Sequence, residues 1–410
     1  MIRKLVLLYF IMCIGAFSSY GQSLDSLLQM VVENSPELKA LQTEYDAELM
    51  KVNQVRALPN MQFGVGIPVL PPETRLGPQI MMVSASQMFP WFGTRKSKGD
   101  VIIAMSKAKY ERISAKRLVL FNKIELAYYA LIELKEREGI ISSMLDQFKA
   151  IEQSALAKQE SGNGSMINVL RVRLSQDELQ QQLAEIVPLR EKQFAVINAL
   201  TLAPWNTPIE VQDLNVEVLE IDLEEQHKKL KEHYPLLRLI DAEISASKTR
   251  QLANKKMGAP MIGAGLDYAI VGERTDMDPQ FNGRDIFIPK LMLSIPLYRK
   301  PIRAIHEEER LKQSALAFDR ESLEQRVMGQ LAGYLSNYHV EQVNREHFTE
   351  QIKTTEQILE LLYTEYSTQG RKFDELLQVQ NQLLMYKLKL SKTRKKEYIA
   401  ISNMKKLINY

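Results

Sequence analysis

Histidine is the residue type of this chain best suited to bind a metal ion or to transfer a proton, and its spacing argues against both roles. None of the five histidines belongs to an H-E-x-x-H pattern or to another metal-ligand spacing. His339 and His347 lie eight residues apart and could share a helix face, but solvated surface is the commoner role of such a pair. The sequence also contains no Ser/His/Asp set, no phosphate-binding loop and no paired catalytic carboxylates in a recognisable context. We therefore predict no catalytic residue, no cofactor and no metal-binding residue, and we do not expect an enzyme. The five histidines are His227, His233, His306, His339 and His347.

Methionine leaves one binding chemistry open. Two of the 18 methionines, Met1 and Met12, fall in the first 21 residues, which leaves 16. Met81, Met82 and Met88 stand close together in the sequence. A thioether can ligate soft copper(I), whereas the commoner use of methionine is to fill gaps in packing. Both interpretations stay open at this point.

The first 21 residues have the pattern of a secretory signal. Two basic residues precede an apolar stretch, Leu5 to Phe17, which has the length of a signal core and is too short to span a bilayer. We predict cleavage before Gln22. The only cysteine, Cys13, leaves with this segment, so we expect no thiol, disulfide or cysteine metal site in the mature chain.

The balance of charge argues against one class of partner. The 410 residues include 53 Lys and Arg against 50 Asp and Glu, a net charge of +3. That excess is too small for a nucleic-acid surface. Charges of both signs are finely mixed along the predicted helices, which indicates solvated helix faces. We predict no nucleic-acid partner.

One series of motifs occurs twice, about 200 residues apart, and repeats of this kind decide the fold. Asn34-Ser35-Pro36-Glu37-Leu38 in the first half corresponds to His233-Tyr234-Pro235-Leu236-Leu237 in the second. Proline and glycine-rich strand patterns, an apolar-Pro-aromatic sequence and a glycine break follow in the same order in both halves. We predict a first repeat over residues 22–205 and a second over 206–410, each with helices, a β-hairpin and a pair of long helices.

Long helical patterns dominate both repeats. A helix of about 65 residues spans roughly 100 Å, and such a helix needs partner helices along its whole length. The glycine breaks supply them by folding each long helix back as an antiparallel hairpin. The helices alone fit a soluble antiparallel coiled coil equally well. Helices are predicted for Ser23–Glu33, Pro36–Ala57, Thr94–Gln159 and on to Leu200, and again near 223–257, 301–368 and 371–407.

Four segments alternate apolar residues with small or polar ones, which is typical of strands with one apolar face. Each is close to the 9–11 residues that a tilted strand needs to cross hydrocarbon. Four strands cannot close a barrel, and open edges are not tolerated in lipid, so several chains would have to share one barrel. Three chains give twelve strands. A soluble sandwich is the alternative, but it needs a second apolar surface. The segments are 61–69, 81–86, 262–270 and 290–297, in hairpins over about 60–90 and 260–298.

The order and spacing of these motifs resemble the TolC-type outer-membrane efflux proteins of Gram-negative bacteria, over essentially all of the mature chain. The resemblance implies a mainly α fold with a membrane β-barrel contribution. Long antiparallel helical hairpins are the staves of an α-barrel, and four strands per chain join in a trimer to form a 12-stranded barrel. The motifs that carry the resemblance are Ser35-Pro36-Glu37-Leu38, the run from Ser86 to Arg95, Ser294-Ile295-Pro296-Leu297-Tyr298, and the glycine breaks followed by Val169-Leu170 and Leu376-Leu377.

The resemblance also implies a function. The chain would be a passive trimeric exit duct of a tripartite efflux system, in the cell outer membrane and extending into the periplasm. Its partners would be further copies of itself, outer-membrane lipid, a periplasmic adaptor protein and an inner-membrane pump, and it would open at the helix-hairpin tips. Metal ions are one candidate cargo. The alternative that the helices leave open is a soluble periplasmic coiled-coil scaffold or adaptor.

The resemblance places adaptor docking at the two glycine turns. Asp374 is the candidate gate residue, because a carboxylate near the narrowing of a trimer would form a cation-attracting ring. A plain helix-capping role for Asp374 is equally compatible with its position. Asn168 departs from the acidic residue that the pattern often carries, which puts a doubled acidic constriction in doubt. The turn residues are Gly162, Gly164 and Ser165 in the first repeat and Gly370, Arg371 and Lys372 in the second.

Overall fold

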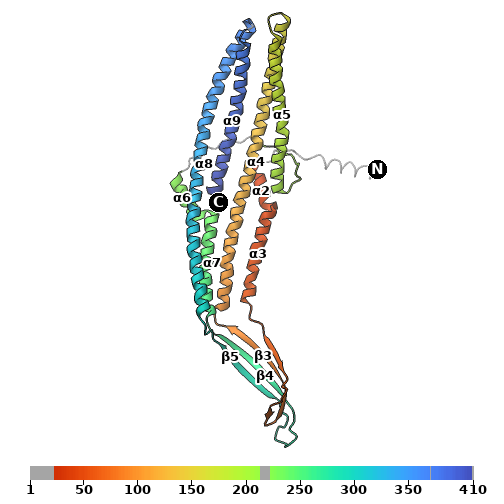
Figure 1. The fold of residues 1–410 in the computed structure, drawn as a ribbon, viewed down its shortest axis with the longest axis vertical. Coiled ribbons are helices and arrows are strands. Elements are labelled where there is room, and N and C mark those ends of the chain that lie inside the picture. The colour runs from red at the N-terminus through yellow and green to blue at the C-terminus, as the bar shows by residue number, and fades with distance from the viewer. Residues whose placement is uncertain (1–22, 213–221, 370, 409–410) are drawn as a thin grey trace, which may run out of the picture. The chain divides into compact units, whose positions relative to one another are not determined.

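The computed structural model describes residues 23–212, 222–369 and 371–408 (Figure 1). The predicted signal segment, 1–21, and Gly370 lie outside the described residues. The first half of the chain contains α2 (Leu24–Asn34), α3 (Pro36–Arg56), β1 (Gln62–Gly66), β2 (Glu73–Thr74), β3 (Gly77–Pro90), α4 (Thr94–Glu160) and α5 (Met166–Thr201). The second half contains α6 (Leu223–His233), α7 (Pro235–Met257), β4 (Met261–Val271), β5 (Ile286–Ser294), α8 (Lys300–Gln369) and α9 (Phe373–Ile408).

The same local chemistry starts the paired helices in each half. Ser23 caps α2 by accepting a hydrogen bond from the Ser26 amide at 3.2 Å, and Asp222 caps α6 by accepting one from the Glu224 amide at 2.9 Å. The next helices, α3 and α7, both begin with proline, which needs no amide partner in the first helical turn.

The chain divides into two compact units, and each draws on both halves of the sequence. One unit comprises the described parts of Met1–Lys39, Ser114–Tyr234 and Gln325–Tyr410, and the other comprises Ala40–Ile113 and Pro235–Glu324. Because these units are defined by spatial contact, they do not test the sequence repeats 22–205 and 206–410, which stay a prediction.

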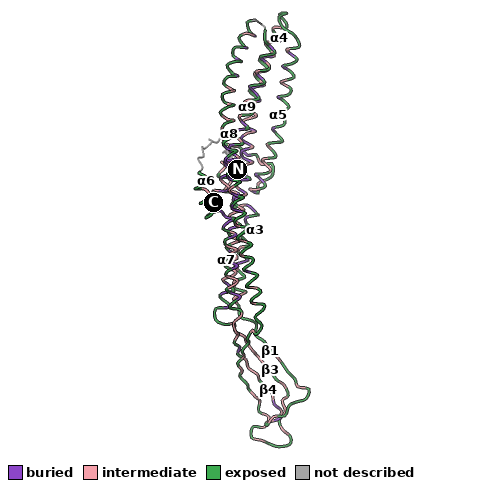
Figure 2. Tube along the Cα trace, turned by 60° about the vertical axis from the view of Figure 1, so that its left-hand side comes forward, coloured by how far each residue is buried: buried purple, intermediate pink, exposed green. Residues whose placement is uncertain are grey.

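The first unit is built on two helical hairpins, α4 with α5 and α8 with α9. Their buried side chains form one hydrophobic core, which includes Phe148 of α4, Val172 of α5, Leu362 of α8 and Leu383 of α9. Figure 2 shows buried residues running along these helices. Tyr129 of α4 stacks on Tyr398 of α9, with ring centroids 5.0 Å apart. The predicted long helices and hairpins are therefore confirmed.

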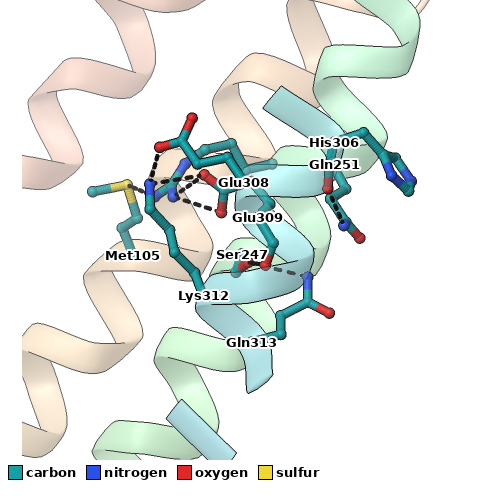
Figure 3. A network of polar contacts seen from close by, with 9 residues as sticks. Met105, Ser247, Gln251, His306, Glu308, Glu309, Lys312 and Gln313 are labelled. Carbon is teal, nitrogen blue, oxygen red and sulfur yellow. Dashed lines mark hydrogen bonds and ion pairs between the residues drawn. The ribbon is translucent and has the colours of Figure 1, made fainter. Parts of the chain in front are cut away.

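The second unit contains the sheet and the helices that adjoin it. Here α7 is joined to α8 by a polar network (Figure 3). Ser247 of α7 donates to the backbone oxygen of Glu309 at 3.2 Å and accepts from Gln313 at 3.1 Å. Gln251 donates to the backbone oxygen of His306 at 3.0 Å. These contacts fix the register of the two helices.

The sheet is antiparallel, with its long strands in the order β1-β3-β4-β5. The hairpin of each half is preserved, and the two hairpins join through β3 and β4, which pair from Met81 opposite Ile270 to Pro90 opposite Met261. The predicted contribution of four strands is confirmed, and the structure adds the two-residue strand β2, which pairs with the start of β3. Gly77 sits where β3 begins with φ of 134°, and a Cβ there would lie 1.8 Å from the carbonyl oxygen of Gly272.

Several predicted boundaries differ from the structure. The strand expected over 81–86 is longer, Gly77–Pro90, and the one expected over 290–297 is displaced to Ile286–Ser294. The helix expected near 223–257 is two helices, because the chain turns at Tyr234 before Pro235 and ends α6 with a hydrogen bond from the Tyr234 amide to Leu230 at 3.1 Å. The strand expected over 61–69 ends at Gly66. Its partner β3 is irregular between Gln79 and Met81, and the following Pro68 has no amide hydrogen for a ladder.

Candidate functional site: the sheet face and the hairpin turns

The register aligns the apolar residues of all four long strands on one face of the sheet. Val83 of β3 lies opposite Val65 of β1 on one side and Tyr268 of β4 on the other, and Tyr268 lies opposite Phe287 of β5. Directly opposed residues point to the same side, and side chains alternate along each strand. The apolar positions of both halves therefore form a single surface.

This apolar face is open in the single chain. Phe63 of β1 is 74% exposed and Leu291 of β5 is 87% exposed. Figure 2 shows exposed and half-buried residues along the strands. An exposed apolar surface of this extent marks a contact with lipid or with another protein. The face comprises Phe63, Val65, Met81, Val83, Ala85, Phe89, Ile262, Ala264, Leu266, Tyr268, Ile270, Phe287, Leu291 and Leu293.

The opposite face is mixed, with small, polar and charged residues beside a few apolar ones such as Met88 and Ile288. Asp267 of β4 pairs with Lys290 of β5 at 2.6 Å. Ser84 and Ser86 of β3 occupy the same face, next to glycines in β1 and β4. One face of the sheet is thus suited to an apolar environment and the other to water.

The sheet has two strands with an unpaired side. Among the described residues, β1 pairs only with β3 and β5 pairs only with β4. An edge strand presents backbone N–H and C=O groups that another strand can satisfy. A sheet with an apolar face and two such edges has the features of a piece of a larger closed structure.

The first hairpin turn needs its two glycines for different reasons. Gly162 ends α4 with φ of 76°, a left-handed conformation that glycine adopts without strain, and the next amide, that of Asn163, bonds to the oxygen of Lys158 at 2.8 Å. A Cβ on Gly164 would lie 2.8 Å from the backbone nitrogen of Gln159. Ser165 then caps α5 by accepting from the Ile167 amide at 3.2 Å.

The second hairpin turn contains charged residues. Lys372 has φ of 66° and pairs with Glu365 of α8 at 2.8 Å, so this ion pair lies within one hairpin. The hydrogen bond with Glu365 raises the pKa of Lys372. Asp374 and Glu375 lie in the first turn of α9, where negative charge interacts favourably with the helix dipole.

Two contacts tie the hairpins to each other near these turns. Arg171 of α5 forms an ion pair with Asp374 of α9. Lys158 of α4 lies over the ring of Tyr366 in α8, 5.0 Å from its centroid, and donates to the backbone oxygen of Ser367 at 3.3 Å. Burial raises the pKa of the Tyr366 hydroxyl. Separating the two hairpins would require breaking both contacts.

The sequence matches no protein-family model and no curated protein. Solved structures match almost the whole chain. The outer-membrane channel OprN is 15% identical and has a TM-score of 0.74, with 94% of this chain and 89% of that chain covered. CusC is 12% identical at a TM-score of 0.75, with 96% and 95% covered. The MtrE outer-membrane channel of Neisseria gonorrhoeae, in its open state, is 13% identical at a TM-score of 0.72, with 94% and 88% covered.

This chain has the TolC-type fold. The similarity extends over both helical hairpins and the strands, because nearly the full length of each chain is covered. At 12–15% identity the likeness is one of fold, and it says nothing about individual side chains.

The predicted turn residues lie where the sequence placed the two hairpin turns. Gly162, Gly164 and Ser165 form the first turn, and Arg371 and Lys372 lie in the second, where Arg371 is exposed. Their role in adaptor docking stays a prediction, as does the gate role of Asp374. Gly370 lies outside the described residues.

Sequence reasoning missed the partners of these residues. Arg171 and Lys158 were not singled out, although each contacts the other hairpin. The pair Arg171 and Asp374 is separated by 203 residues, so no local spacing could signal it. A basic residue near one turn and an acidic residue near the other was the only available indication.

Two kinds of feature are absent from the residues that the structure describes. No group of three or more His, Cys, Asp or Glu side chains could hold a metal ion in residues 23–212, 222–369 and 371–408. Within the same ranges, no helix is both long and apolar enough to cross a membrane.

Proposed function

We propose that the chain is one subunit of a passive exit duct in the outer membrane, serving an efflux system. The observation that carries the proposal is the sheet whose apolar residues, such as Val65 and Leu291, share one open face while Asp267 and Lys290 lie on the other. A sheet of this kind separates lipid from water when it forms part of a barrel. The TolC-type fold, shared with outer-membrane channels, supports the same conclusion.

The two unpaired edges make other copies of the chain the natural partners. If β1 of one copy pairs with β5 of the next, the strands of three copies close a barrel of twelve, and no edge remains in lipid. The helical hairpins of the three copies would then line a continuous passage. A periplasmic adaptor would dock at the hairpin turns, and an inner-membrane pump would supply the driving force.

The gating step follows from the contacts near the turns. The ion pair between Arg171 and Asp374 and the contact of Lys158 with Tyr366 hold the two hairpins of one chain together. An adaptor that binds the turns would exchange these contacts for its own and allow the hairpins to separate. The expected result is a duct that is narrow alone and opens with its partner.

The direct test is single-channel recording of the purified full-length protein in a planar bilayer. We expect discrete conductance steps, larger or more frequent when Asp374 is replaced by alanine. Absence of conductance from folded oligomer, in both the wild type and Asp374→Ala, would contradict the proposal. Chemical cross-linking in detergent should give a trimer as the largest cross-linked species.

A soluble periplasmic scaffold is the competing function, and fractionation separates the two. A scaffold appears in the periplasmic fraction without detergent, whereas a duct subunit stays with the outer membrane until detergent is added. The open apolar face favours the duct, because a soluble protein would have to cover that face.

A further inference from the structure

Three methionines lie on the face of the sheet that also carries Asp267 and Lys290. Met88 of β3 and Met292 of β5 lie on either side of Gly263 of β4, in one row across the three strands. Met261 is two residues before Gly263 in β4 and therefore points to the same side. The three side chains thus come from three adjacent strands and lie on the same face, with Met88 and Met292 directly beside Gly263 and Met261 two residues along β4.

The missing side chain of Gly263 is what brings two of the thioether ends together. An ideal Cβ on Gly263 would lie 2.4 Å from Sδ of Met88 and 2.9 Å from Cε of Met292. Both side chains therefore occupy the space above the glycine. They reach the same point from opposite strands.

The surroundings of these methionines differ from an ordinary apolar core. Met88, Met261 and Met292 are each only partly buried, so solvent reaches the cluster. Elsewhere this face carries serine, glycine and the pair of Asp267 with Lys290, at 2.6 Å, as well as apolar residues such as Ile288. Because Asp267 neutralises Lys290, the nearby ammonium group does not leave an uncompensated positive charge beside the sulfurs.

A group of neutral thioethers selects for one class of ligand. Thioether sulfur is a soft donor that favours Cu(I) and similar soft ions, whereas Ca²⁺ and Mg²⁺ require oxygen ligands and Zn²⁺ is held mainly by thiolate, imidazole and carboxylate. Methionine side chains also have three rotatable bonds, which lets their sulfurs converge on an ion without a change in the backbone.

We propose that Met88, Met261 and Met292 bind a soft monovalent cation, Ag⁺ or Cu⁺, above Gly263. The binding site stands independently of the proposed exit duct. The further statement that soft metal ions are a cargo of this protein rests on the proposed function, because it requires the exit duct.

The primary test is calorimetric titration of the full-length protein in detergent with silver nitrate, in chloride-free buffer. We expect one tight Ag⁺ site per chain and no matching Zn²⁺ site. Met88→Leu and Met292→Leu, which nearly preserve volume, should each weaken Ag⁺ binding by about tenfold or more, since loss of a ligand costs at least as much as loss of an outer contact. The double variant should lose the tight site.

Two further variants separate the site from general methionine chemistry. Met50→Leu removes a methionine of α3 that is 62% exposed, and it should leave the tight site intact. Gly263→Ala keeps all three sulfurs but inserts a methyl group between Met88 and Met292, so it should weaken Ag⁺ binding as well. Binding that survives the double variant, or that falls equally in Met50→Leu, would overturn the proposal.

Oxidation supplies a residue-resolved readout. Peroxide converts methionine to its sulfoxide, and a sulfur that donates its lone pair to a metal ion reacts more slowly. Peptide mass spectrometry should show that Ag⁺ slows oxidation of Met88 and Met292 but not of Met50. Equal protection at all three positions would contradict the site.

The two proposals fail in different measurements. If the protein conducts in a planar bilayer but has no tight Ag⁺ site, the binding-site proposal fails and the exit-duct proposal stands. If the wild type never conducts but binds Ag⁺ at a site that the double variant loses, the exit-duct proposal fails and the binding-site proposal stands.

Discussion

Arg250 of α7 donates from one guanidinium nitrogen to both carboxylate oxygens of Glu309 in α8, at 2.9 and 3.0 Å. The Glu309 side chain is 2% exposed and that of Arg250 is 37% exposed. Burial alone would raise the pKa of the Glu309 carboxyl, but the hydrogen bonds from Arg250 and the charge of Lys312 hold that pKa below its ordinary value. The helix-to-helix register in this unit therefore depends on an ionised carboxylate.

Removing the arginine should destabilise this unit more than removing an exposed neighbour. Arg250→Ala leaves Glu309 buried without its main partner, and we expect a loss of about 2 kcal/mol, below the range for fully buried pairs because Arg250 is partly solvated. Arg310→Ala is the matched control, since its pair with Glu307 is exposed and worth less than about 0.5 kcal/mol. Thermal unfolding followed by circular dichroism measures both. Equal losses of unfolding free energy in the two variants would show that the buried pair stabilises the fold no more than the exposed one.

The same pair predicts an acid dependence. A carboxyl whose pKa is lower in the folded than in the unfolded chain stabilises the fold above the unfolded pKa, and this stabilisation is lost as pH falls through the folded pKa. The difference in stability between wild type and Glu309→Gln should therefore shrink as the pH falls from 7 to below 4. A difference that is constant over this range would contradict the assignment.

Buried Glu397 predicts the opposite pH dependence. Its side chain is fully buried, no described donor forms a hydrogen bond with its carboxylate oxygens, and the nearest cation is Arg345, at 3.4 Å. Burial raises the pKa of Glu397, and Glu341 adds to the rise, while Arg345 and Arg394 oppose it. A raised carboxyl pKa means that the folded state holds a proton longer, so this residue costs stability as pH rises above the unfolded pKa.

Glu397→Gln should therefore raise the unfolding temperature at pH 8 and have a smaller effect at pH 4.5. The amide keeps the shape of the side chain and removes only the ionisation. Glu356→Gln is the control, because Glu356 pairs with Lys387 on the surface and contributes little at either pH. A gain for Glu397→Gln that is larger at pH 4.5 than at pH 8 would reverse the sign and contradict the prediction.

The pair Arg171 and Asp374 predicts a coupling that is visible in conductance and not in stability. Both side chains are more than half exposed, so the pair should contribute less than about 1 kcal/mol to folding. Arg171→Ala and Asp374→Ala should each raise the open probability, and the swapped pair Arg171→Asp with Asp374→Arg should restore the closed state. Lys372→Ala removes an ion pair within one hairpin and should leave the open probability unchanged. If it has the same effect as Arg171→Ala, the two hairpins are not held by their mutual ion pair.

The two faces of the sheet should respond differently to the same charge. Leu291→Arg places a guanidinium on the apolar face and should cost about 2–4 kcal/mol of insertion into a bilayer, if the residue lies near the middle of the membrane. Ser84→Arg places it on the opposite face, beside Asp267, and should cost little. Partition of each variant between detergent-free vesicles and buffer measures the difference. Equal partition would contradict the assignment of the faces.

Local chemistry in the sequence was enough to predict most of the elements. Pro36 marks the start of α3, and the alternation from Ile262 to Ile270 marks β4. The glycine break at Gly162 follows the end of α4 at Glu160, one residue past the predicted Gln159. These signals are short-range, since a cap, a left-handed glycine or a two-residue period is complete within a few residues. The long helical hairpins and the single apolar face follow from them.

What the sequence could not predict depends on pairing between distant segments. The row from Met88 through Gly263 to Met292 exists only because β3 of one half pairs with β4 of the other in one particular register. The early end of β1 at Gly66 likewise reflects an irregularity in its partner strand. A shift of one residue would place every side chain on the other face, and no pattern within a single strand sets that register.

If the unpaired sides of β1 and β5 are completed by strands from other copies, as we propose, the completion of this fold is a matter of mass action. Part of the folding free energy is then a binding free energy. A melting temperature measured for this protein would accordingly depend on its concentration, and dilution would itself be a denaturing condition. In a cell, the rate of synthesis would then determine how long a newly made chain carries its apolar face uncovered.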